Sequence, residues 1–273
     1  MPGEQTKREA RLETFKTFST FLSSVVIALA TFLATREYNS QQLEISRNKA
    51  LSELIPKLGD IDPNVRKFSA VSLALYGKNA VPALLATLND EKQAVRHAAA
   101  TSLGIIGTSA AADLMKVYSD KLRDHSVRAG VLYALGLMRH EPAAELAIAA
   151  LLDKGEDAGV RIDAAEVLGM LRNKKGVKAL LSVLKYDAEA DTLLVRNSLE
   201  ALSKIKDVSE TREIRNLLFD SHPNIRLWAL WTVKEIGDTS AIGDLLRIES
   251  DEKKSEYERL RAQEVLTQLE ARK

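Results

Sequence analysis

Few residues of this 273-residue chain have the types and spacing that catalysis or metal binding requires. Cysteine is absent, which excludes disulfides, thiolate zinc sites, iron–sulfur clusters and cysteine nucleophiles. The sequence also lacks a His-Glu-x-x-His zinc motif, a glycine-rich phosphate loop and a serine-nucleophile motif; its four histidines are His97, His125, His140 and His222. We therefore expect no catalytic residue, no metal and no cofactor, and we predict that the protein is not an enzyme.

Aspartate and arginine recur in register along the chain. After residue 50, an Asp-containing turn is followed seven times by an aliphatic residue and an arginine, at intervals of 30 to 35 residues. The pairs are Val65-Arg66, Val95-Arg96, Val127-Arg128, Val160-Arg161, Val195-Arg196, Ile225-Arg226 and Leu260-Arg261. Because a catalytic carboxylate–guanidinium set would break the repeat at one place, we interpret these residues as a structural ladder of Asp–Arg contacts across stacked turns.

Each pair begins a predicted helix that follows a shorter apolar helix. Counted from the arginine, apolar or small residues recur at positions −1, +3, +4 and +7, which form one helical face. Glycines at position +11 suit the left-handed residue that ends a helix: Gly77, Gly107 and Gly237. Aspartates that precede these helices are candidate N-caps: Asp62, Asp90, Asp124, Asp157, Asp191 and Asp220.

Neither helix of such a pair can bury its apolar face alone, whereas stacked pairs form one continuous core. We therefore predict an all-α fold over residues 50–273, an α-solenoid of about seven helical hairpins. The pattern resembles HEAT repeats over about residues 48–273, in particular the short HEAT-like form first associated with phycobilin lyases. The resemblance implies that the second helix of each hairpin lines the concave face, and this family includes scaffolds, lyases, hydroxylases and DNA-repair enzymes.

Two enzymatic functions of that family lack the residues that they need. HEAT-type deoxyhypusine hydroxylases carry several His-Glu dyads as iron ligands, whereas this chain has one, His140-Glu141. A DNA-glycosylase-like enzyme needs a basic concave surface, yet the chain beyond residue 43 contains 34 basic and 34 acidic residues. We therefore expect no nucleic-acid partner.

The N-terminal segment differs in composition from the repeats. A charged tail at residues 1–16 precedes a run without charge at 17–35, which as a helix spans about 28 Å and nearly matches the hydrocarbon core of a bilayer. We predict a transmembrane helix at 17–36 and a polar helical stalk at 37–49. Small and hydroxyl residues on one face of this helix favour close packing of two copies as a homodimer: Thr20, Ser24, Ala28 and Thr31.

The orientation and the nature of this segment remain open in the sequence. Four basic residues before the run and three after it favour an N-terminus inside the cell by a margin of one charge. The alternatives are a helix that lies on a membrane surface or caps the repeats, and a cleaved signal peptide with Ala28 and Ala30 at its cleavage site.

Both tryptophans of the protein fall on the helix face that points away from the predicted core. Position +5 of each second helix is the most outward, and positions +1, +2 and +9 flank it. The residues that we predict to bind a partner protein there are Phe68, Val71, Thr101, Tyr133, Asp163, Glu166, Trp228 and Trp231. Exposed aromatic side chains often anchor interfaces, although these could instead fill the concave curve or lie under the C-terminal cap.

The sequence thus favours a single-pass, membrane-anchored HEAT-repeat scaffold that binds another protein through its concave face without chemistry of its own. One alternative is a HEAT-like lyase or cofactor-assembly subunit, which a single, non-repeated polar cluster in a pocket would favour. The other alternative is a soluble repeat protein whose first helix packs on its own body.

Overall fold

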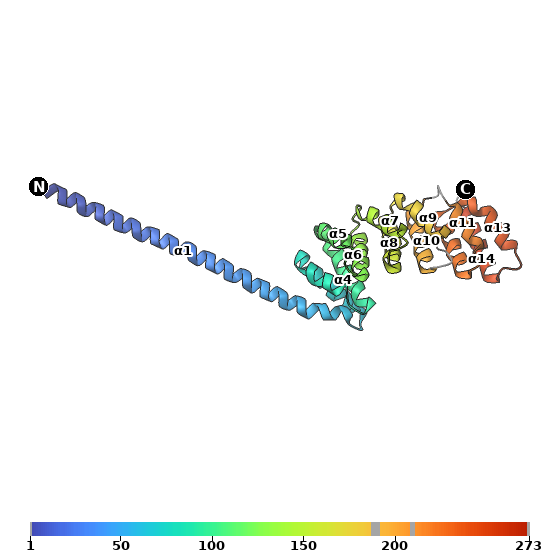
Figure 1. Cartoon of the computed structure of the whole chain (residues 1–273), viewed down its shortest axis with the longest axis horizontal. Coiled ribbons are helices and arrows are strands. Elements are labelled where there is room, and N and C mark those ends of the chain that lie inside the picture. Colours follow the sequence, from blue (N-terminus) through green and yellow to red (C-terminus); the bar gives the residue numbers. More distant parts are fainter. Residues whose placement is uncertain (1, 187–191, 208–210, 272–273) are drawn as a thin grey trace. The chain divides into compact units, whose positions relative to one another are not determined.

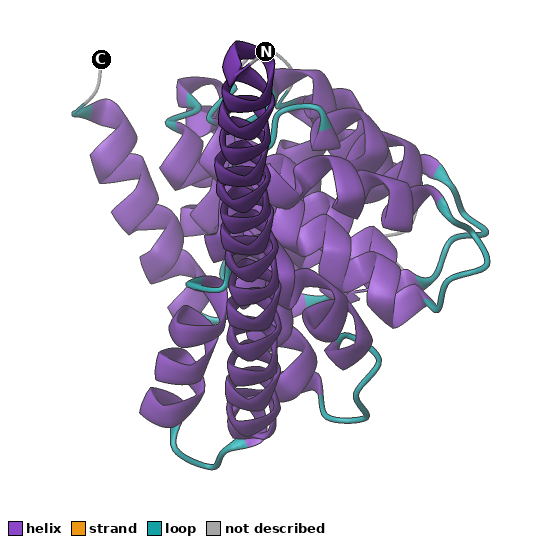
Figure 2. Cartoon of the chain, turned by 90° about the vertical axis from the view of Figure 1, so that its left-hand side faces the viewer, coloured by secondary structure: helices purple, strands orange, loops and turns teal. Residues whose placement is uncertain are grey.

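The computed structural model describes residues 2–186, 192–207 and 211–271 and divides the chain into two units, Met1–Glu53 and Leu54–Lys273. Within helices, the side chains of residues 2–21, 23, 24, 185, 186 and 192 lie outside this description. Helices and short connecting loops make up the described residues, and no strand occurs among them (Figure 2).

The first unit is one uninterrupted helix, α1 (Pro2–Leu54). No proline or glycine occurs between Gly3 and the end of the helix, so no residue type in the sequence breaks it. The helix runs through the predicted tail, membrane segment and stalk. The Thr31 hydroxyl donates a hydrogen bond to the Ile27 carbonyl at 2.8 Å, which satisfies the hydroxyl within the helix itself.

The four residues of the predicted packing face on α1 are only partly described. Ala28 and Thr31 are exposed, whereas the side chains of Thr20 and Ser24 lie outside the described ones. The membrane-spanning segment at 17–36 and the homodimer through it therefore stay predictions.

The second unit is a row of helical hairpins, which confirms the predicted all-α solenoid (Figure 1). The first helices of the hairpins are η1 (Ile55–Gly59), η2 (Gly77–Ala80) with α3 (Val81–Thr87), η3 (Gly107–Ala110) with α5 (Ala111–Ser119), α7 (Ala143–Leu152), η4 (Lys174–Gly176) with α9 (Val177–Tyr186), α11 (Arg212–Asn216) with η5 (Leu217–Phe219), and η6 (Thr239–Ala241) with α13 (Ile242–Ser250). The second helices are α2 (Pro63–Ala74), α4 (Gln93–Ile106), α6 (His125–Leu137), α8 (Ala158–Leu171), α10 (Thr192–Ile205), α12 (Pro223–Ile236) and α14 (Glu256–Glu270).

Each second helix packs against the second helix of the next hairpin, from α2 through α14. The first helices contact their counterparts less extensively, so the second helices lie closer together and line the inner, concave side of this unit. Leucines fill the core between the two layers, and burial of each one stabilises the fold by about 2–3 kcal/mol relative to an exposed side chain. The fully buried ones include Leu58, Leu73, Leu84, Leu103, Leu132 and Leu168.

The turns between the two helices of a hairpin use the repeated Asp and Arg differently from the predicted ladder. Asp62, Asp124 and Asp157 cap second helices by accepting a hydrogen bond from a backbone N–H, as predicted. Asp90 and Asp220 instead accept from the N–H two residues later in the turn, and Asp191 lies outside the described residues.

Three of the repeated arginines bind carbonyl oxygens of the turn rather than aspartate side chains. Arg66 Nη1 donates to the carbonyls of Asp60 and Ile61, at 2.7 and 2.9 Å, and Arg96 and Arg226 make the equivalent pairs of bonds. The Asp–Arg ladder is therefore wrong for these turns, because a carbonyl pair at the end of a first helix offers a guanidinium two acceptors within its own repeat.

Glycine at position +8 brings three successive pairs of second helices into close contact. A Cβ atom on Gly169 would lie 2.8 Å from the Ala201 Cα, so α8 and α10 meet almost backbone to backbone. Gly104 and Gly136 hold the same place between α4 and α6 and between α6 and α8. The glycines at +11 have the predicted left-handed φ of 55° to 79°, and Arg139 and Arg172 take that conformation in repeats without them.

One described helical stretch is long and apolar enough to cross a membrane by length and composition alone. It is Gln93–Ser119, which has 27 residues and comprises α4, η3 and α5. Half of its most apolar window is buried in the structure, as in the core helices of a repeat stack.

Candidate functional site

The predicted partner-binding residues do not form one site. Phe68, Val71 and Trp231 are exposed, whereas Thr101, Tyr133, Asp163, Glu166 and Trp228 are half-buried. Three of them, Tyr133, Asp163 and Glu166, line one pocket; Val71 and Thr101 line a neighbouring groove; and Trp231 lines a third hollow near the C-terminus. Position +5 is also buried in two repeats, at Ala201 and Leu266, so the outward row is interrupted there.

The central pocket lies on the concave side, between four successive second helices. It encloses about 560 Å³ and is lined from α4, α6, α8 and α10 and the turn before α8. The close helix contacts at Gly104, Gly136 and Gly169 join the same four helices, so glycine packing holds the walls of this pocket together. Its polar side chains include Gln93, Arg96, His97, His125, Ser126, Tyr133, Asp157, Asp163, Glu166 and Asn197.

Two carboxylates of α8 lie one helical turn apart in this pocket. Burial, followed by the nearby carboxylates Glu166 and Asp157, raises the pKa of Asp163 to about 7. Burial also raises the pKa of Glu166, while the Lys204 ammonium partly offsets that effect. No described residue makes a hydrogen bond or an ion pair with the Asp163 carboxylate. The pocket therefore holds a carboxyl group that ionises near neutral pH.

An aromatic pair forms another wall of the central pocket. The His97 and Tyr133 rings lie with their centroids 5.0 Å apart at an interplanar angle of 48°. Burial, followed by the Glu166 and Asp163 carboxylates, raises the pKa of Tyr133 to about 12. The Tyr133 phenol therefore stays protonated at physiological pH and offers an O–H donor beside the two acids.

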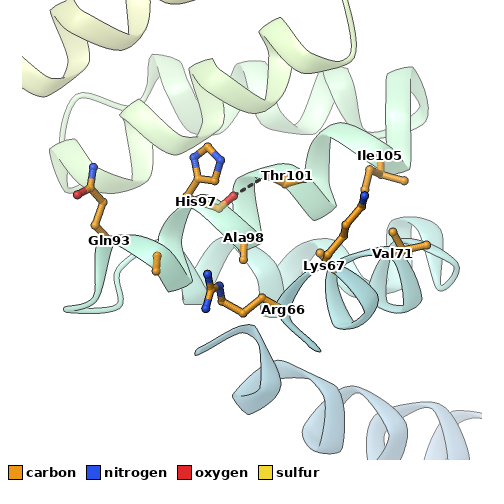
Figure 3. A pocket seen from close by; sticks show the side chains of 10 residues that line it. Arg66, Lys67, Val71, Gln93, His97, Ala98, Thr101 and Ile105 are labelled. Carbon is orange, nitrogen blue, oxygen red and sulfur yellow. Dashed lines mark hydrogen bonds between the residues drawn. The ribbon is translucent and has the colours of Figure 1, made fainter. Parts of the chain in front are cut away.

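The neighbouring groove is more apolar and lies between α2 and α4. It encloses about 510 Å³, and Val71, Ala98, Thr101 and Ile105 contribute to its walls. Figure 3 shows Val71 and Lys67 on α2 facing the side chains of α4, and the Thr101 hydroxyl bonded to the His97 carbonyl. Gln93 and His97 line both hollows, so the apolar groove and the central pocket adjoin at α4.

The tryptophans lie apart from this pair of hollows. Trp231 is 42% exposed and lines a hollow of about 270 Å³ together with Tyr257 and Arg261. Trp228 is half-buried, and the Arg196 guanidinium lies 5.9 Å from its ring centroid. The two rings therefore differ, because Trp231 is available to a partner whereas Trp228 belongs in part to the packing between α10 and α12.

Sequence reasoning did not single out His97 and His125 as residues of this site. His97 occupies position +1 of its helix, one turn before the +5 residue Thr101, and this position faces the concave side as well. In the described part of the chain, no group of three or more histidine, aspartate or glutamate residues is placed to hold a metal ion.

Residues 51–136 match the family described as HEAT repeats. The repeats within this range are of the HEAT type. The row of helical hairpins shares its fold with the Escherichia coli protein YibA, which is 19% identical, with 81% of this chain and 84% of that chain covered at a TM-score of 0.53. No curated protein has a significantly similar sequence.

Two further solved structures are similar at a TM-score of 0.41. One is the CpcE–CpcF complex of phycocyanin lyase from Nostoc sp. PCC7120, at 19% identity over 80% of this chain and 94% of that chain. The other is human deoxyhypusine hydroxylase in complex with glycerol, at 17% identity over 81% and 84% of the two chains. The predicted membrane segment finds no support in any of these matches.

The prediction that the protein is not an enzyme is wrong. The solved structures similar to this chain include a phycocyanin lyase and a deoxyhypusine hydroxylase. A fold by itself does not decide whether a protein is an enzyme. At 17–19% identity these likenesses show the fold alone and assign no activity to this chain.

Proposed function

We propose that this protein is a membrane-tethered HEAT-repeat protein that binds another protein along the concave face of its second helices. The observation that carries the proposal is the distribution of side chains on that face. Exposed apolar residues lie toward both of its ends, at Phe68 and Val71 in the first repeat and at Trp231 in the sixth. The half-enclosed polar pocket lies between them.

This distribution is typical of an interface. Phe68 and Trp231 are 70% and 42% exposed, and large aromatic side chains of this kind contribute strongly to binding once a partner covers them. Polar groups between two apolar areas fix the register of a partner more than they add affinity. A partner that spans several repeats would engage all three areas.

The tether is proposed from α1. Residues 17–35 carry no charge, and the apolar side chains Val25, Ile27 and Phe32 on this helix are exposed. If the helix spans a bilayer, alkaline carbonate will leave the protein in the membrane pellet. Release by carbonate would contradict the tether and favour a helix that lies on a surface or packs on the repeats.

Photocrosslinking from defined positions tests the partner-binding face. A photoreactive amino acid at Phe68 or Trp231 should crosslink the same partner protein in cells, whereas one at Leu152, which is 52% exposed on the first helix α7, should not. The variant Trp231→Ala should weaken crosslinking from Phe68 about tenfold, with an unchanged melting temperature. Equal crosslinking from Leu152, or loss of folding in Trp231→Ala, would contradict the proposed face.

A second candidate function is chemistry in the central pocket, as in a lyase or cofactor-assembly subunit. It is favoured by the single, non-repeated cluster of Tyr133, Asp163, Glu166 and His97, because a carboxyl group with a pKa of about 7 is suited to proton transfer near neutral pH. Native mass spectrometry of the protein after exposure to a small-molecule extract tests it. A retained compound that Asp163→Asn fails to retain would support this function, and no retained compound would count against it.

A further inference from the structure

Asp163 differs from the buried carboxylates elsewhere in the repeats. Glu156, Asp238 and Glu258 have side chains only 5 to 7% exposed, and each lies within 4 Å of an arginine: Arg128, Arg215 and Arg226, respectively. Asp163 has no such partner among the described residues. Since a half-buried carboxylate without a cationic partner has lost part of its hydration, the central pocket can accept a positive charge beside Asp163.

The charged groups around Asp163 do not supply that charge. On α4, Arg96 Nη1 already donates to the carbonyls of Asp90 and Glu91. On α10, Lys204 pairs with Glu200 at 2.8 Å. The remaining titratable groups that line the pocket are two histidines, the phenol and two more acids: His97, His125, Tyr133, Asp157 and Glu166.

The walls of the pocket also suit the stem of a basic side chain. Ala129, Ile162 and Leu193 contribute apolar surface, and the His97–Tyr133 pair presents aromatic rings beside the acids. A lysine or arginine side chain combines an apolar stem with a cationic head, and aromatic rings and carboxylates together stabilise that head. The apolar groove between α2 and α4 adjoins the pocket at Gln93 and His97, which line both.

We propose that the central pocket binds the cationic head of a lysine or arginine side chain of the partner protein, and that the α2–α4 groove takes an apolar side chain of the same segment. The inference rests on the proposed partner-binding function. It identifies the partner chemically, as a protein segment in which an apolar residue lies close to a basic one.

Methyl NMR of the full-length protein in detergent tests this proposal directly. The δ1 methyl groups of Ile162 in the central pocket, Ile105 in the apolar groove and Ile225 in the distant helix α12 serve as reporters. The probes are acetyl-Leu-Ala-Lys-amide, the same peptide with norleucine in place of lysine, and free n-butylammonium. We expect the lysine peptide to shift Ile162 and Ile105 but not Ile225, and to bind at least about tenfold more tightly than the other two probes.

Two variants separate the carboxylate from the fold. Asp163→Asn keeps the shape of the side chain and should weaken binding of the lysine peptide about tenfold or more. Tyr133→Phe keeps the ring and should retain binding within about twofold. Unchanged Ile225 shifts and a cooperative thermal melt at or above the wild-type midpoint establish that both variants are folded.

The pH dependence of binding supplies an independent readout. Because Asp163 is ionised above about pH 7 and protonated below it, binding of the lysine peptide should be stronger at pH 8 than at pH 5.5. Asp163→Asn should therefore reduce this pH dependence substantially, although His97, His125, Asp157 and Glu166 still line the pocket in the variant.

Three outcomes of these experiments would overturn the inference. Equal affinity for the norleucine peptide would show that charge is not recognised, and an unchanged affinity in Asp163→Asn would show that this carboxylate is not the acceptor. Equally tight binding of n-butylammonium would replace the partner segment with a small amine. Crosslinking from Phe68 and Trp231 can succeed while these tests fail, so failure of the pocket and failure of the proposed partner-binding face are distinguishable.

Discussion

The pair of Arg128 and Glu156 provides a quantitative test of how successive repeats are held together. The Arg128 Nη1 lies 2.8 Å from Glu156 Oε1 across two hairpins, and both side chains are only 5% exposed. The hydrogen bonds from Arg128 lower the pKa of Glu156 from its usual 4.5 to about 2. Since one pH unit of difference between the folded and unfolded pKa corresponds to about 1.4 kcal/mol, the ionised Glu156 contributes about 3 kcal/mol of stability at pH 7.

Glu156→Gln removes the charge while keeping the shape of the side chain. We expect the free energy of opening of α6 and α8 to fall by about 3 kcal/mol at pH 7, which corresponds to amide hydrogen exchange about a hundredfold faster in those helices. Because the folded pKa is lowered, this contribution is complete above about pH 4.5 and is lost as the pH falls toward 2. The difference between wild type and variant should therefore shrink to less than half at pH 3.

Lys121→Gln is the matched control for this experiment. The Lys121 ammonium contacts the same carboxylate at 2.9 Å, but its side chain is 64% exposed, so its loss should cost less than about 0.5 kcal/mol. An equal effect of Lys121→Gln and Glu156→Gln, or an effect of Glu156→Gln that persists undiminished at pH 3, would refute the reasoning.

Three further predictions concern stability measured by urea or thermal unfolding. Gly169→Ala should destabilise the protein by about 1–3 kcal/mol because its Cβ meets the backbone of the next repeat, whereas Gly243→Ala, with open space around the new Cβ, should be neutral or slightly stabilising. Asp163→Asn should raise the free energy of unfolding by about 1–3 kcal/mol at pH 7.5. The pKa of Asp163 is raised in the folded protein, so the wild type loses stability as the pH rises from about 4 to 7, and the variant does not. At pH 4 the two proteins should be equally stable. Arg172→Gly should raise the melting temperature and Gly237→Ala should lower it, since both positions have a left-handed backbone, and equal responses of the two would contradict that account.

The repeat architecture could be predicted because its signals are local and recur in every unit. The −1, +3, +4 and +7 pattern placed the core, and the cap at Asp157 and the left-handed Gly107 lie where their residue types predicted. Local chemistry of this kind does not depend on how the hairpins curve. The partners of Arg66 were mispredicted, because a sequence shows which charges recur but not that turn carbonyls offer nearer acceptors.

The pocket depends on how the row of hairpins curves, which the sequence pattern does not show. Position +5 was treated as equally outward in every repeat, yet Ala201 is buried and Trp231 is exposed. Tyr133, Asp163 and Glu166 were named as separate positions on one face, and only the close approach of α4, α6, α8 and α10 gathers them with His97. The signal that could have found this group was the run of glycines at +8, which marks the repeats whose second helices come closest.

The glycine contacts also determine where this stack can bend. At the three joints around the pocket, a Cβ atom on the glycine would lie 2.7 to 2.8 Å from the next helix, whereas the corresponding +8 position carries Ala74, Lys204 or Lys234 at the joints closer to the ends. A lysine side chain between two helices can change rotamer when the helices rotate slightly, whereas a glycine has no side chain that can adjust. The terminal hairpins can therefore rotate to fit partners of different curvature, while the central hairpins keep the geometry of the pocket.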